Sequence, residues 1–318
     1  MSYFKGIQLK GGKIFVETTG ATIDINKTFF KDMSAVLKIF IYFKITGLKN
    51  IFKKKTYQKT LAFHPQTPGP WFNIWQVSRL ANLRTITDMQ DADYIFAFED
   101  STLTKFDKKT FSLLNSRIIN QDINNISKEH VADVFETIFG YSLRIDPLTH
   151  IGPAIRKSDR NGTHDGIVIQ CPIDKSEQLE GQSYQYLVDS TFNGTTSEDL
   201  RVAYVLGELA LVYHKHKPLD DRFGTHYLSV DIYDANEVFS KSEVKLIKAF
   251  CKNMHLDFGA IDVMRDKNNG RIYIVDVNKT CMPVLSLSLK KQIECQQKIA
   301  DVLVRRLQSN IEKGRKPT

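Results

Sequence analysis

The chain has 318 residues, 42% hydrophobic and 11% aromatic, so it can bury a large core and is not a disordered protein. The formal net charge is +8, but residues 1–60 hold twelve lysines and three acids. The remainder is near neutral, which argues against a nucleic-acid partner. Four scattered cysteines lack Cys-x-x-Cys or Cys/His spacing, which argues against disulfides and zinc and favours a cytoplasmic setting. Residues 1–20 show no signal-peptide pattern.

The basic segment at residues 1–56 predicts a hairpin and then an amphipathic helix. Residues 6–18 place two short apolar runs around a Gly-Gly turn. Residues 32–53 are strongly apolar with spaced lysines. Four lysines fall within about 60° of one another on a helix, whereas Lys44 falls on the other side: Lys31, Lys38, Lys49 and Lys53. The uncharged runs are shorter than a membrane span. Two interpretations stay open: a helix in a membrane interface with Phe40, Phe43 and Phe52 in lipid, or a helix packed in the core with a solvated lysine edge.

Residues 57–120 predict a small α/β unit. Residues 60–64 fit a strand, 71–83 a helix, and 93–99 a nearly continuous apolar strand of the kind buried in parallel sheets. Ligands of such sheets bind beyond the carboxyl ends of the strands. Four residues near those ends could therefore line a substrate crevice: His64, Trp71, Glu99 and Asp100. In the alternative interpretation His64 caps a turn, Trp71 is a core side chain, and the two acids are solvated at the end of a strand.

The C-terminal part predicts an acidic hairpin between two helices, at residues 242–254 and 287–307. A short apolar run carries Asp262, a polar turn follows at residues 266–270, and the second run ends in Asp276 and Asn278. Positions 276 and 278 share one face of a strand, and folding the hairpin brings Asp262 close to them. Two carboxylates and an amide oxygen on one face suit Mg²⁺ that also holds nucleotide phosphates.

This hairpin resembles the metal-binding end of the ATP-grasp superfamily. Four upstream motifs follow that family's order and resemble carboxylate–amine ligases related to ribosomal-protein S6 glutamate ligase. They are an entry helix at Asn120–Gly140, a lysine and glycine loop at Pro153–Gly166, a hinge strand at Tyr184–Val188, and Asp199-Leu200-Arg201. The resemblance covers about residues 115–310. It implies an α+β ATP-grasp fold, with subdomains at 121–190 and 191–310 that clasp ATP, after a shortened Rossmann-like α/β domain at 57–120.

The same resemblance implies roles for individual residues, with ATP and Mg²⁺ (or Mn²⁺) as cofactors. Phosphates would meet Lys128, Lys157 and a loop containing Gly162 and Gly166. Adenine would lie on a hinge formed by Gln185, Tyr186, Leu187 and Val188, with Asp189 or Glu198 accepting from the ribose. Mg²⁺ would be held by Asp262, Asp276 and Asn278, and the reacting phosphoryl or acyl group would meet Arg201, Lys215 and Arg222. His214 and His216 point away from the Lys215 face, and with no third ligand in the neighbouring sequence we expect no metal there.

The expected activity is ATP-dependent ligation through an acyl phosphate, in which a peptide or small-molecule carboxylate is joined to an amine or thiol. Three departures from the family pattern keep alternatives open: Asp276 where many ligases have Glu, Gln185 in the hinge, and a different segment after Lys215. One alternative is a phosphotransferase acting on a sugar or polyol hydroxyl. The other is a non-catalytic nucleotide-binding module recruited to a membrane by residues 31–55. A homodimer is also compatible with the resemblance.

Overall fold

The computed structural model describes residues 7–17, 22–52, 59–112, 114, 116–163, 165–222, 224 and 227–314. The N-terminal part holds a three-stranded antiparallel sheet, formed by β1 (Ile7–Lys10), β2 (Lys13–Val16) and β3 (Thr22–Asp24). The predicted Gly-Gly turn joins β1 to β2. Helix α1 (Lys27–Phe52) begins earlier than the sequence indicated, because the side chain of Asn26 accepts the Phe29 N–H at 3.0 Å.

Helix α1 has two apolar faces with different surroundings. One face is buried, and its Phe40 and Phe43 rings lie 6.1 Å and 5.5 Å from the Trp75 ring. The core-packing interpretation is therefore correct for Phe40 and Phe43. The other face exposes large apolar side chains, at Phe30, Met33, Leu37, Ile41 and Ile45. Lys53 lies outside the described residues, and the side chains of Lys49 and Phe52 are not described.

A parallel sheet follows, in the order β5-β4-β6-β7. It consists of β4 (Lys59–Pro65), β5 (Leu83–Ile86), β6 (Tyr94–Phe98) and β7 (Arg117–Ile119), with α2 (Asn73–Leu80) and the short helix η1 (Lys108–Phe111) between strands. Strand β6 is buried throughout, as its apolar run predicts. The helix expected to reach Leu83 ends at Leu80, because Asn82 takes a left-handed conformation (φ 57°) and turns the chain into β5.

A smaller antiparallel sheet, in the order β10-β8-β9, lies beside helix α3 (Lys128–Phe139). Its strands are β8 (Gly152–Ser158), β9 (Ile167–Cys171) and β10 (Gln182–Tyr186), and the turn η2 (Lys175–Glu177) precedes β10. The Ser127 side chain caps the start of α3, and Gly140 ends the helix at a positive φ of 75°. These caps fix Lys128 in the first turn of α3.

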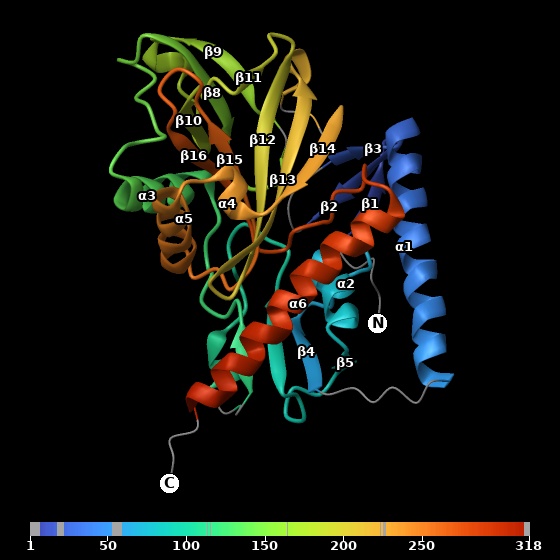
Figure 1. Ribbon diagram of the computed structural model, residues 1–318. Coiled ribbons are helices and arrows are strands. Elements are labelled where there is room, and N and C mark those ends of the chain that lie inside the picture. The colour runs from blue at the N-terminus through green and yellow to red at the C-terminus, as the bar shows by residue number, and fades with distance from the viewer. Residues whose placement is uncertain are drawn as a thin grey trace.

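The largest sheet runs in the order β14-β13-β12-β15-β16, with β11 paired to β12 (Figure 1). Its strands are β11 (Thr191–Phe192), β12 (Thr196–Val205), β13 (Glu208–Pro218), β14 (Ser229–Tyr233), β15 (Phe258–Arg265) and β16 (Ile272–Asn278). The turn η3 (Leu219–Asp221) follows β13, and the helices α4 (Ala235–Val238), α5 (Lys241–Asn253) and α6 (Leu289–Gly314) complete the fold.

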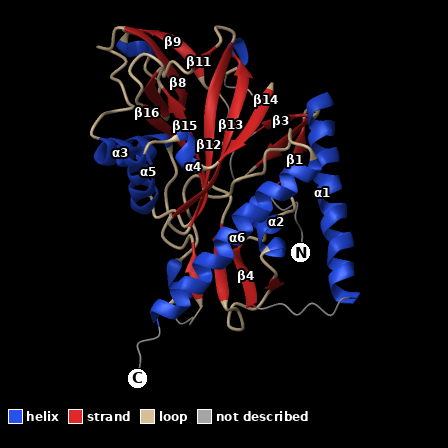
Figure 2. Cartoon of the chain, in the orientation of Figure 1, coloured by secondary structure: helices blue, strands red, loops and turns tan. Residues whose placement is uncertain are grey.

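Two cores hold the large sheet in place. Apolar side chains of α3 and α5 pack on one face of the sheet, around Phe135 and Phe250. The other core joins the large sheet to the parallel sheet and α6, around Phe96, Phe258 and Leu303. Helix α6 crosses the molecule diagonally and packs against α2 and β13 (Figure 2). The hairpin β15–β16 is thereby held between the small sheet with α3 and the parallel sheet.

Candidate active site

The β15–β16 hairpin gathers the three predicted metal ligands on one face. Asp262 lies directly opposite Asp276, and Asn278 lies opposite Ala260 on the same face as Asp276. The Asn278 Nδ2 donates to Asp262 Oδ2 at 3.2 Å. The two strands approach closely at Gly259, where a Cβ atom would lie 2.5 Å from the carbonyl oxygen of Asn278. The spacing that suggested a shared site in the sequence is therefore matched by a shared site in space.

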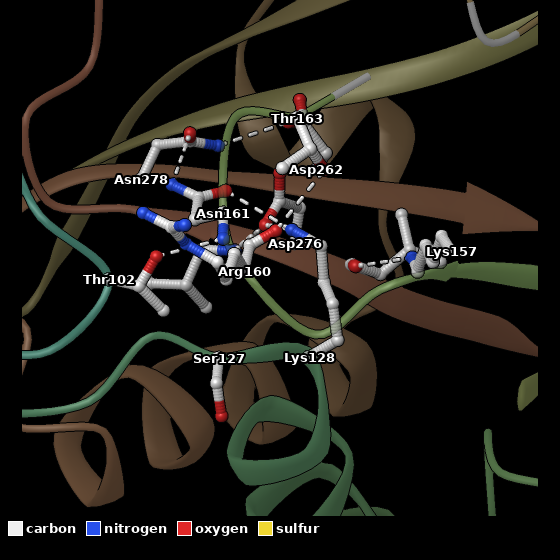
Figure 3. Close-up of polar contacts among 12 residues, drawn as sticks. Thr102, Ser127, Lys128, Lys157, Arg160, Asn161, Thr163, Asp262, Asp276 and Asn278 are labelled. Atoms are coloured by element: carbon white, nitrogen blue, oxygen red, sulfur yellow. Dashed lines mark hydrogen bonds and ion pairs between the residues drawn. The ribbon is translucent and has the colours of Figure 1, made fainter. Parts of the chain in front are cut away.

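Both predicted phosphate lysines reach this hairpin, Lys128 from α3 and Lys157 from strand β8 of the small sheet (Figure 3). The Lys128 Nζ lies 2.6 Å from Asp276 Oδ1, and the Lys157 Nζ donates to the Val275 carbonyl at 3.3 Å. Burial lowers the pKa of Lys157 to about 7, and the nearby charge of Lys128 lowers it in the same direction. Two lysine amino groups therefore lie at the strand that carries Asp276.

Asn161 connects these groups, and sequence reasoning missed it. Its Oδ1 accepts from Lys128 Nζ at 3.1 Å, and its Nδ2 donates to Asn278 Oδ1 at 3.4 Å. Its backbone N–H donates to Thr102 Oγ1 at 2.9 Å, which ties the loop to the parallel sheet region. Gly162 follows with a φ of 79°, a conformation that favours glycine. The only signal in the sequence was the position of Asn161 inside the Lys157–Gly166 loop.

Asp262 belongs to a second, more buried ion-pair network. Arg201 lies opposite Asp262 across β12 and β15, with its Nη1 3.3 Å from Asp262 Oδ2. The Lys215 Nζ is 3.3 Å from Asp262 Oδ1 and 2.9 Å from Asp199 Oδ2, and this lysine is only 2% exposed. Burial alone would raise the pKa of Asp262, but Arg201 and Lys215 hold it well below its usual range. Asp262 is therefore a carboxylate at neutral pH.

The predicted hinge segment contacts the tip of the same hairpin. The Tyr186 hydroxyl donates to Asp266 Oδ2 at 2.7 Å, a bond that raises the pKa of Tyr186 to about 12. Asp189 pairs with Lys267 at 3.0 Å. Burial opposes the ionisation of Asp189, but hydrogen bonds from Thr191 and Lys267 lower its pKa to about 2. The remaining hinge residues are buried or partly buried, as at Gln185, Leu187 and Val188.

Two predicted site residues lie away from this cluster. Glu198 neighbours Asp199 on β12 but points to the opposite face of the sheet, where its Oε2 lies 2.7 Å from His214 Nε2. Arg222 follows η3, and its Nε donates locally to the Leu219 carbonyl at 3.4 Å. Gly166 directly precedes β9, at the C-terminal end of the loop that contains Asn161.

The residues expected at the substrate crevice have structural partners. His64 packs against the Phe106 and Phe111 rings, and burial lowers its pKa. Glu99 is buried and accepts the Lys105 N–H at 2.9 Å.

Asp100 joins the parallel sheet to the segment that follows the acidic hairpin. The Thr280 hydroxyl donates to Asp100 Oδ1 at 2.7 Å, and burial raises the pKa of this carboxyl. Next to it, the Lys279 Nζ donates to Thr104 Oγ1 at 2.9 Å, and burial lowers the pKa of Lys279 to about 8. Trp71 packs against the core shared by the two sheets. Asp100 is therefore a structural contact in this arrangement and not a solvated strand exit.

With its small antiparallel sheet, its large sheet and the α/β unit that precedes them, the chain has the ATP-grasp fold. Solved structures of the ATP-grasp ligase PsnB match it in three complexes. With minimal precursor the TM-score is 0.51 at 11% identity, covering 79% of this chain and 100% of PsnB. With minimal precursor, Mg and ADP it is 0.51 at 10% identity, covering 78% and 96%. With a phosphomimetic precursor variant, Mg and ADP it is 0.50 at 9% identity, covering 78% and 98%.

At these identities the likeness concerns the fold. No protein-family model matches the sequence, and no curated protein matches it. The fold class expected from the sequence is confirmed, including the α/β unit that precedes the two clasping sheets. Among the described residues, no helix has both the length and the apolar character needed to cross a membrane.

Proposed function

We propose that the protein is an ATP- and Mg²⁺-dependent ligase that joins a carboxylate to an amine, or to a thiol, through an acyl phosphate. The observation that carries the proposal is the meeting of Lys128 and Lys157 with Asp262, Asp276 and Asn278 at one hairpin. Such a site combines cations for phosphates with hard oxygen donors for a metal. Asp100, Glu99 and His64 have structural partners, so they are not part of the proposed chemistry.

The donor set fits Mg²⁺. Carboxylate and amide oxygens are the ligands that this ion prefers, and Asp262 and Asp276 lie directly opposite each other on adjacent strands. The side chain of Asp276 remains 24% exposed although it pairs with Lys128. Held by Asp262, Asp276 and Asn278, Mg²⁺ would neutralise the negative charge that develops on the nucleotide phosphates. Asn278 would add a neutral oxygen.

The cations around Asp262 have different proposed roles. Lys128 and Lys157 are placed to bind phosphate oxygens. Arg201 keeps 17% of its side chain exposed, so it can both hold Asp262 and contact the reacting phosphoryl group. Lys215 is buried between Asp199 and Asp262. We therefore assign Lys215 to positioning Asp262 rather than to touching substrate.

The proposed acid substrate is a small-molecule or peptide carboxylate; PsnB, whose fold the chain shares, has been solved with a minimal precursor, Mg and ADP. A carboxylate oxygen would attack the γ-phosphorus of ATP and release ADP. An amine would then attack the acyl carbon, form an amide and expel inorganic phosphate. Thus one ATP would yield one ADP and one phosphate for each bond made.

Calorimetric titration of a non-hydrolysable ATP analogue tests the site. Wild-type protein should bind with Mg²⁺, and the double variant Asp276→Asn/Asn278→Ala should lose that binding. Asp122→Asn is the control, because Asp122 is an exposed acid that pairs with Lys108 far along the sequence from the hairpin. Unchanged binding in the double variant would contradict the proposed site. Phosphate release with peptide substrates then separates the ligase from a phosphotransferase, which would keep the phosphoryl group on its product.

The exposed face of α1 supports a second proposal, contact with an anionic membrane surface. Phe30 is 63% exposed and Leu37 is 56% exposed, and both lie on the face turned away from Trp75. Lys27, Lys31 and Lys38 border this face on the helix. An apolar face beside lysines suits the boundary between acyl chains and anionic headgroups. A second copy of the chain is the alternative occupant that an experiment has to separate.

A further inference from the structure

The face of the large sheet opposite Arg201 and Lys215 carries a cluster of three potential metal ligands. Glu198 lies directly opposite His216 across β12 and β13, and His214 is two residues earlier on β13. One ligand atom from each of the three side chains lies within 4.8 Å of the others. All three are partly buried. Because side chains alternate along a strand, this cluster is separated by the sheet from the Asp262 network.

The third ligand comes from the preceding strand, β12, which is paired with β13 in the sheet. The two histidines alone gave no reason to expect a metal, and Glu198 was expected at the nucleotide. In the fold, Glu198 Oε2 lies 2.7 Å from His214 Nε2. The carboxylate therefore lies directly against the imidazole.

His216 is oriented in the way that metal-binding histidines are. Its Nδ1 lies 3.1 Å from Ser229 Oγ on β14, while its Nε2 is buried and has no hydrogen-bond partner. A hydroxyl that accepts from Nδ1–H leaves the Nε2 lone pair free for a metal, and such outer partners fix the ring and its tautomer. A buried nitrogen without a partner costs free energy, which coordination would remove.

We infer that Glu198, His214 and His216 bind a divalent transition-metal ion of the Zn²⁺ class. Two imidazoles and one carboxylate match the ligand types of Zn²⁺ and not the all-oxygen shell of Mg²⁺. Three protein ligands leave one tetrahedral position for water or for Asp231, which lies opposite His214 on β14. Metal binding here would tie β12 to β13 and, through Ser229, to the edge strand β14. This inference does not depend on the proposed ligase activity.

The test uses full-length protein without a histidine tag and Zn²⁺ in competition with a chromogenic chelator. We expect one tight site per chain, and Co²⁺ should give visible absorption bands of a four-coordinate ion. Glu198→Gln and His216→Gln should weaken Zn²⁺ binding at least tenfold. Ser229→Ala should weaken it about tenfold, as loss of an outer partner does. Circular dichroism establishes that each variant is folded.

Two control variants distinguish Zn²⁺ binding at this cluster from Zn²⁺ binding elsewhere on the protein. His150→Gln removes a histidine outside the cluster and should leave Zn²⁺ affinity unchanged. Asp276→Asn alters the nucleotide face and should also leave it unchanged. Absence of a tight site in wild-type protein would overturn the inference. Equal Zn²⁺ affinity in wild type and in folded His216→Gln would overturn it as well.

Discussion

Lys157 should make nucleotide binding depend on pH near neutrality. Burial and the charge of Lys128 lower the pKa of Lys157 to about 7 in the folded chain. At that pKa the ammonium form makes up about 0.9 of the protein at pH 6, about 0.5 at pH 7 and about 0.1 at pH 8. If phosphate binds only the charged form, affinity falls about tenfold between pH 6 and pH 8. Binding at pH 7 should also take up about half a proton per site.

Calorimetry measures both effects with Mg²⁺ and a non-hydrolysable ATP analogue. Proton uptake appears as a change in observed heat between two buffers that differ in ionisation enthalpy. The Lys157→Met variant should bind the ATP analogue more weakly and should lose the proton uptake that Lys157 contributes. Lys157→Arg keeps a charge that does not titrate in this range, so its affinity should be nearly constant with pH. Titration of the nucleotide itself is common to all three proteins and cancels in the comparison.

The same pKa predicts that the free energy of unfolding rises with pH, whereas nucleotide affinity falls. An unfolded lysine has a pKa of about 10.4, so between pH 7 and pH 10 the unfolded chain binds more protons than the folded one. Lys157 therefore adds an increase of stability with pH across this window, and Lys157→Met should remove that increase in urea unfolding. Identical proton uptake in wild type and Lys157→Met would refute the assignment of Lys157 to the phosphates.

Three further changes probe other parts of the structure. Lys215→Met removes a 2% exposed ammonium from two carboxylates and should reduce the free energy of unfolding by about 3 kcal/mol in urea titrations, because each acid keeps one other cation. A loss below about 1 kcal/mol would be inconsistent with that network. Leu37→Glu should reduce sedimentation with phosphatidylserine vesicles at least tenfold, whereas Ile151→Glu, which replaces another exposed apolar residue, should not. If Leu37→Glu instead halves the mass measured by light scattering, the face binds a second copy. Gly259→Ala places a methyl group about 2.5 Å from the Asn278 carbonyl oxygen. It should reduce the free energy of unfolding by about 1–3 kcal/mol and weaken Mg²⁺-dependent binding of the ATP analogue. Unaltered affinity and stability would show that the strands move apart freely.

The parts predictable from sequence were those set by local spacing. The 276/278 spacing and the turn at 266–270 determined which face carries the acids, and hairpin register placed Asp262 opposite Asp276. Lys128 was expected only through the resemblance of its helix to the entry helix of the ATP-grasp superfamily, and the structure begins that helix at the Ser127 cap. The resemblance to a known fold supplied the order of these pieces, which spacing alone does not contain.

The parts not predictable were those set by the register of strand pairing and by contacts between distant segments. Glu198 and His216 are adjacent only because β12 pairs with β13 in one register, and a shift of one residue would turn Glu198 toward Lys215. The partners of Asp100 and Lys279 come from segments far apart in sequence. The helix α1 was ambiguous for another reason, because its apolar surface is wider than one packing face requires.

The short contact between Lys128 and Asp276 has a consequence for the order in which ligands bind. In the ion pair, each side chain takes the place of the ligand that the other is proposed to bind. Lys128 lies where the metal ion would contact Asp276, and Asp276 lies where a phosphate would contact Lys128. Nucleotide alone would have to compete with Asp276, and metal alone with Lys128. Arriving together, they exchange one ion pair for two, so each ligand should increase the affinity of the other by the same factor. The ligand-free protein would therefore bind the metal–nucleotide complex more tightly than it binds the metal or the nucleotide alone.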